Sequence, residues 1–134
     1  MPTELFLPIT LTSAAAAALI TIWLALRCGQ MRLKHNIIHG DDGGGPLTRR
    51  MRAQLNFVES APFVLFLIAA IELSGRGQSW LALVAGVYML GRVAHAIGMD
   101  AEGPHRLRQI GVIVTLVTLL GLAGAATLVA MRVM

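Results

Sequence analysis

The sequence predicts an all-α integral membrane protein folded as an up-down bundle of four transmembrane helices. Of its 134 residues, 56% are apolar and only 13% are charged, and the mean hydropathy is positive. Four apolar stretches account for this composition, and each approaches the roughly 20 residues that a helix needs to cross about 30 Å of hydrocarbon. Because open sheet edges leave backbone groups unsatisfied in lipid, we expect helices rather than strands.

We expect the chain to form a single membrane domain over residues 1–134, with helices over 5–27, 49–73, 79–99 and 104–131. The first connection contains GDDGGGP, a strong turn signal, and Thr48 just after it is the expected N-cap of the second helix. The second connection, SGRGQS, is short. In the third, GMDAEGPHR, Pro104 is expected in the first turn of the last helix, where a missing N–H is tolerated. Such short connections favour an up-down bundle.

The distribution of basic residues predicts how the bundle is oriented. Only Arg76 and Arg132 lie at the end of the bundle that carries the chain termini. The other nine of the eleven cations flank the first and third connections: Arg27, Arg32, Lys34, Arg49, Arg50, Arg52, Arg92, Arg106 and Arg108. The positive-inside rule therefore places both termini outside and these two connections in the cytoplasm. Orientation explains the net charge of +4, so we expect no nucleic-acid partner.

A polar stripe begins the second span, in the segment RAQLNFVESAP. Arg52, Asn56 and Glu59 are spaced i, i+4, i+7, so they share one face of a helix. An acid near the bilayer centre costs at least about 2.5 kcal/mol, so such residues indicate a functional site. A ligand pocket would use guanidinium groups for carboxylates and Glu59 for an ammonium group. The alternative is an internal clasp in which Glu59 pairs with Arg92 and Asn56 bridges them.

The third span, which is the least apolar, carries a second polar stripe. Tyr88, Arg92, His95 and Met99 fall on one face of a 3.6-residue helix, so this stripe is expected to face the first. His95 is interpreted either as an interior histidine with satisfied hydrogen bonds or as a ligand contact. A metal site is not expected, because the His35 and His39 pair lies beside an exposed glycine-rich loop.

Arg106 is the candidate catalytic residue. It follows Pro104 at the start of the fourth helix, where the helix dipole disfavours a cation, so local helix energetics do not explain it. A guanidinium and a helix N-terminus together lower the pKa of a bound thiol and so favour the nucleophilic thiolate. The alternative is an interfacial arginine that contacts lipid phosphate or sets topology.

The segments RAQLNFVESAP and GRVAHAIGMDAEGPHRLRQIG resemble the MAPEG family, membrane-associated proteins in eicosanoid and glutathione metabolism. The chain looks like a bacterial-type member. The resemblance implies a homotrimer of four-helix subunits in a bacterial inner membrane, with glutathione bound as co-substrate between subunits near the cytoplasmic face. By position it implies that Arg106 stabilises the thiolate and that Arg52, Gln54, Asn56 and Glu59 bind glutathione. We add Tyr88, Arg92 and His95 from the second stripe as expected glutathione contacts.

The sequence departs from the best-characterised members at three positions. Ser60, His95 and Met99 stand where those members have tyrosines, so the expected pocket has fewer hydroxyl groups. The leading hypothesis is a membrane glutathione S-transferase or peroxidase-like enzyme acting on a lipophilic electrophile from the bilayer. The alternative is a non-catalytic, lipid-binding or scaffold protein of the same family. A small multidrug-type transporter is disfavoured, because that class needs an embedded acid in its first helix and 5–27 has none.

Overall fold

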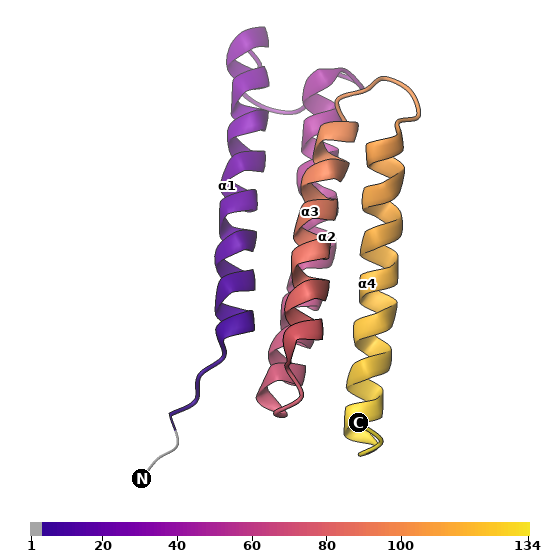
Figure 1. The fold of residues 1–134 in the computed structure, drawn as a ribbon. Coiled ribbons are helices and arrows are strands. Elements are labelled where there is room, and N and C mark those ends of the chain that lie inside the picture. The colour runs from indigo at the N-terminus through magenta and orange to yellow at the C-terminus, as the bar shows by residue number, and fades with distance from the viewer. Residues whose placement is uncertain (1–3) are drawn as a thin grey trace.

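The computed structural model describes residues 4–134, and residues 1–3 of the predicted domain lie outside this range. The described chain is all-helical, with four helices: α1 (Pro8–His35), α2 (Pro46–Leu73), α3 (Ser79–Gly98) and α4 (Arg106–Ala130). Each is long and apolar enough to cross a membrane. The helices run alternately up and down, so the connections α1–α2 and α3–α4 share one end of the bundle and the termini share the other (Figure 1). The predicted fold class is confirmed.

Helices α2 and α3 form the middle of the bundle. Both pack against α1 and α4, whereas α1 and α4 do not touch each other within the described chain. Accordingly, half of the apolar stretch of α3 is buried, compared with 17% in α1 and in α4. The polar residues that make α3 the least apolar span therefore lie inside the protein and not against lipid. Tyr88, Arg92 and His95 are all buried.

The first helix continues past residue 27, where the predicted span ends. The segment CGQMRLKH contains no helix breaker, and its basic residues lie in the last turn, where the helix dipole favours cations. The helix ends at Asn36, which adopts a left-handed conformation (φ 53°) and donates its N–H to the Arg32 carbonyl. The helix thus extends about two turns beyond the apolar stretch, into the basic end of the bundle.

The second helix begins before the predicted cap residue. Gly45 is the N-cap and Pro46 occupies the first turn, so Thr48 lies inside the helix rather than at its cap. Asp42 caps the helix from the preceding loop: its carboxylate accepts from the backbone N–H of Leu47 (2.8 Å) and of Thr48 (2.9 Å). Partial desolvation raises the pKa of Asp42, but hydrogen bonds from the Thr48 hydroxyl and these amides outweigh it and lower the pKa to about 2.

The fourth helix begins after Pro104 and not with it. His105 is the N-cap, and its Nδ1 accepts from the backbone N–H of Leu107 (3.2 Å), so the helix starts at Arg106. A side chain that accepts from the first turn satisfies one of the N–H groups that have no partner within the helix. Consequently Arg106 is the first residue of α4.

Candidate functional site

A polar cavity of about 440 Å³ lies at the basic end of the bundle, between α2, α3, the α3–α4 connection and α4. This volume is within the range of small-molecule sites, about 300–1,000 Å³. No residue of α1 lines it. The lining residues are Gly44, Arg49, Arg52, Leu55, Asn56, Glu59, His95, Met99, Ala101, Glu102, Arg108 and Val112.

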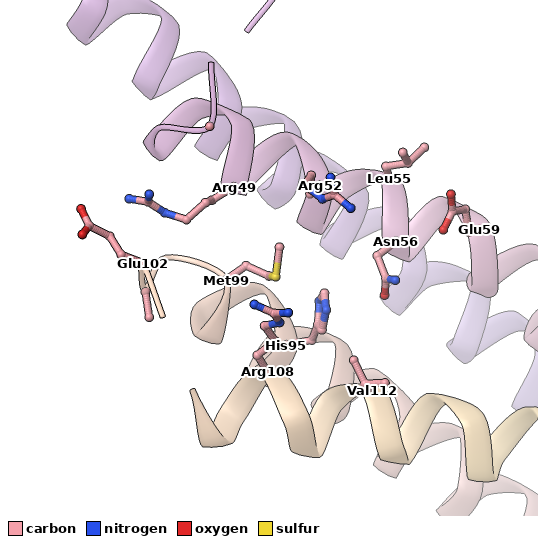
Figure 2. A pocket seen from close by; sticks show the side chains of 12 residues that line it. Arg49, Arg52, Leu55, Asn56, Glu59, His95, Met99, Glu102, Arg108 and Val112 are labelled. Atoms are coloured by element: carbon pink, nitrogen blue, oxygen red, sulfur yellow. The ribbon is translucent and has the colours of Figure 1, made fainter. Parts of the chain in front are cut away.

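One wall of the cavity is a row of polar side chains on α2. Figure 2 shows Arg49, Arg52, Asn56 and Glu59 in order along this helix. Their spacing of three, four and three residues keeps them on one helical face. The structure thus brings the predicted stripe to a single cavity and extends it by one turn to Arg49.

The opposite wall comes from α3 and α4, which approach each other closely through two glycines. A Cβ atom on Gly111 would lie 2.7 Å from the Gly91 carbonyl oxygen and would clash with the Cβ of His95. A Cβ atom on Gly98 would clash with the backbone nitrogen of Arg108. These contacts place His95 and Arg108 next to each other on the wall that faces α2 (Figure 2).

Beneath this wall, Arg92 contacts two residues of the cavity lining. It is only 2% exposed and does not line the cavity. Its guanidinium contacts the Asn56 side-chain oxygen, His95 Nδ1 (3.2 Å) and the Thr115 hydroxyl (2.6 Å). The alternative pairing of Arg92 with Glu59 does not occur in the described chain, where the guanidinium contacts Asn56 of α2 instead. Glu59 makes no ion pair within residues 4–134.

The cavity is therefore lined by exposed charges of both signs. Arg52 and Arg108 are exposed, Arg49 is partly exposed, and none forms an ion pair with a residue that the structure describes. Glu59 and Glu102 are also exposed, at well-separated points of the lining (Figure 2). Three guanidinium groups and two separate carboxylates suit a ligand that carries more than one anionic group and an ammonium group.

Four of the predicted site residues lie elsewhere in the single chain. Gln54 faces α1, where its oxygen lies 3.6 Å from the Cys28 sulfur. Tyr88 is fully buried and its hydroxyl bonds to Ser60 (2.7 Å). Arg92 lies below the cavity, as described above. Arg106 is exposed but does not line this cavity.

Sequence reasoning missed Arg49, Glu102 and Arg108 as site residues. Arg49 carried a usable signal, because it stands three residues before Arg52 on the same helical face. Arg108 had no such signal, because only the packing of α3 on α4 decides which face of α4 meets the cavity. Glu102 lies in an irregular connection, where no periodicity predicts direction.

An ionic clasp holds the connection that carries Glu102. The Asp100 carboxylate pairs with Arg27 of α1 and with Arg50 of α2 (3.4 Å). Arg27 is mostly buried, donates to the Ala96 carbonyl (3.1 Å), and lies over the Trp23 ring at 4.9 Å. Three helices are thus joined at the end of α3, which fixes the position of the cavity wall formed by residues 101–102.

A scan against protein-family models matches residues 10–128, nearly the whole chain, to the MAPEG family. The chain belongs to the MAPEG family. No curated protein matched in a sequence search. The match confirms the resemblance to this family. Membership makes this MAPEG chain an integral membrane protein with a glutathione-related transferase, peroxidase or related role.

Family membership also bears on the ligand. MAPEG proteins generally use glutathione as a substrate. Among residues 4–134 no three His, Cys, Asp or Glu side chains are grouped as they would be around a metal ion. In this MAPEG chain, the polar cavity is the candidate site for glutathione.

Proposed function

We propose that the protein is a membrane glutathione S-transferase or peroxidase-like enzyme that directs a glutathione thiolate at a lipophilic electrophile. The observation that carries the proposal is the convergence of Arg49, Arg52 and Arg108 with Glu59 on one cavity in a MAPEG chain. Glutathione has two carboxylates, one ammonium group and one thiol. Guanidinium groups would take the carboxylates, and Glu59 would take the ammonium group.

Arg106 is the proposed catalytic residue, and it would act on the cavity of a neighbouring subunit. It does not line the cavity of its own chain, whereas MAPEG members are typically trimeric. In a homotrimer, the exposed start of α4 of one subunit would lie against the next subunit. There the Arg106 guanidinium and the α4 N-terminus would stabilise the negative charge on the glutathione sulfur.

In the proposed reaction, the thiol first loses its proton to water. The thiolate then attacks the electrophilic carbon, an S–C bond forms, and the leaving group departs with its electron pair. With an aryl halide, the products are the thioether conjugate and halide. A lipophilic substrate would reach the site from the bilayer. Holding both reactants together supplies much of the acceleration in reactions of this kind.

The test is conjugation of a chromogenic aryl halide by the purified, reconstituted protein. Arg106→Ala is compared with Arg76→Ala, an arginine at the other end of the bundle. We expect Arg106→Ala to lower kcat by about 10²–10³, the usual cost of losing one group that stabilises developing charge. Equal turnover in the two variants would remove Arg106 from the mechanism.

A second candidate function is lipid binding or scaffolding without catalysis. It is favoured by the lack of hydroxyl groups on the α3 side of the cavity, where Met99 lies on the wall and Tyr88 is buried against Ser60. Thermal-shift titration separates the two candidates. Stabilisation by lipid and none by millimolar glutathione would favour the scaffold.

We propose the membrane orientation together with the function. The cavity lies at the end of the bundle that carries nine of the eleven basic residues. By the positive-inside rule this end faces the cytoplasm and both termini face outside, in a bacterial inner membrane. Labelling of cysteines introduced at Gln78 and Gly103 tests this: only a cysteine at position 78 should react with an impermeant reagent outside the cell.

A further inference from the structure

The buried Arg92 guanidinium faces two side chains that also border the cavity. Its Nη2 atom contacts both the Asn56 side-chain oxygen and His95 Nδ1 (3.2 Å). A guanidinium only donates hydrogen bonds, and Nη2 carries two hydrogens, one for each of these contacts. Both partners must therefore act as acceptors at the atoms that face Arg92.

Acceptance at Nδ1 determines where His95 carries its proton. A ring nitrogen that accepts a hydrogen bond has no hydrogen of its own, so a neutral His95 carries its proton on Nε2. In the described chain only the Nε atoms of Arg49 and Arg92 are buried polar side-chain atoms without a partner. Nε2 of His95, which makes no hydrogen bond there, consequently keeps access to the cavity that the ring borders.

The same reasoning fixes the direction of the Asn56 amide. Its oxygen is taken by Arg92, so its two N–H hydrogens remain for the cavity that Asn56 lines. The hydrogen-bond directions on the other side of the guanidinium, at Nη1, are also determined. The Thr115 hydroxyl accepts from Nη1 (2.6 Å) and donates its own hydrogen to the Gly111 carbonyl (2.8 Å). Each hydrogen bond in this series, from Asn56 and His95 through Arg92 and Thr115 to Gly111, thus has a defined donor and a defined acceptor.

We propose that Arg92 is a positioning residue that makes the inner wall of the cavity a pure hydrogen-bond donor, through His95 Nε2–H and the Asn56 amide. Such a wall binds a group that accepts hydrogen bonds, such as a carboxylate or a thiolate, and disfavours an ammonium group, which can only donate. Arg92 would thereby act on the ligand without touching it. The choice of glutathione as the probe below rests on the proposed function, whereas the state of His95 does not.

Nuclear magnetic resonance of ¹⁵N,¹³C-histidine in the protein in lipid nanodiscs measures the tautomer directly. The chain has four histidines, and His95→Gln identifies the signal of interest. We expect a neutral His95 with the proton on Nε2 in the protein without ligand. A neutral His95 with the proton on Nδ1 would overturn the proposal, whatever the protein binds.

Two variants separate the effect of Arg92 from a general effect on packing. Thr115→Val removes one partner of Arg92 but leaves its contact with His95, so the tautomer should stay unchanged. Arg92→Met removes the donor, and we expect a mixture of tautomers. A folded Arg92→Met protein with an unchanged tautomer would contradict the proposal. If Arg92→Met does not fold, the proposal is decided by the tautomer of His95 in the unmodified protein.

Ligand selection is tested with glutathione and Asn56→Asp, which replaces the amide donor by a carboxylate that only accepts. Asn56→Ser, which can still donate, is the matched control. We expect Asn56→Asp to weaken glutathione binding at least tenfold more than Asn56→Ser does. Equal weakening would overturn the donor wall. An unmodified protein that binds no glutathione would contradict the proposed function instead and leave the tautomer result standing.

Discussion

Arg106 and Arg108 stand two residues apart at the start of α4 and face in different directions. Arg108 lines the cavity of its own chain, and Arg106 does not. Successive helical residues are separated by about 100°, so positions i and i+2 lie on nearly opposite sides of a helix. The first turn of α4 can therefore present one cation to its own chain and another to a neighbour.

This geometry predicts different kinetic effects for the two arginines. Arg108→Ala should raise the KM for glutathione about tenfold or more, because it removes a charged hydrogen-bond donor from the binding cavity. Arg106→Ala should mainly lower kcat. Steady-state kinetics with glutathione and an aryl halide, varied separately, measures both. A purely kcat effect of Arg108→Ala would contradict its assignment to binding.

The close packing of α3 on α4 at Gly111 gives a prediction with a control on the same helix. Gly111→Ala would push a methyl group against His95 and the Gly91 carbonyl, so it should destabilise the protein by about 1–3 kcal/mol. Gly121→Ala meets nothing within 4 Å and should be neutral or stabilising by up to about 1 kcal/mol. Unfolding in detergent micelles measures both. Equal effects would mean that the helices do not approach at Gly111.

Glu72 ties the end of α2 to the start of α1. Its carboxylate accepts from the backbone N–H of Ile9 (2.9 Å) and of Thr10 (2.7 Å) and from the Thr10 hydroxyl (2.7 Å). Glu72→Gln should lower the free energy of unfolding by about 1–3 kcal/mol, since a carboxylate that receives several hydrogen bonds loses its charge. Glu4→Gln, which changes an exposed carboxylate nearby, is the control and should have little effect. Denaturant titration in micelles provides the measurement.

The cap of α2 should depend on pH. The pKa of Asp42 is lowered to about 2 in the folded protein, against an ordinary value of 3.8. Because the folded pKa is the lower one, the stabilisation is fully present above about pH 4 and is lost as the pH falls towards 2. Unfolding titrations between pH 5 and pH 2 should show this loss in the unmodified protein and in Asp41→Asn. Asp42→Asn should lack it, and an identical pH profile for Asp42→Asn would refute the cap.

The α2 wall of the site could be predicted from the sequence, because all its residues belong to one helix. Spacing alone puts Arg52, Asn56 and Glu59 on one face, and the structure finds all three along one cavity. The spacing of α3 predicted correctly that His95 and Met99 would face them. It could not separate these two from Tyr88 and Arg92, because depth below the surface depends on how close α4 lies.

The composition and periodicity of the chain determined that it forms four membrane-spanning helices with a polar face on the second. Those properties follow from the cost of exposing charges and backbone groups to hydrocarbon, which local sequence is enough to reveal. Which side chains touch was decided only by the tertiary structure. In the folded chain Gly111 packs against His95, Arg92 is buried against Asn56, and Glu59 forms no ion pair with a residue that the structure describes. Local sequence does not reveal these contacts, because packing between helices depends on residues far apart in the sequence.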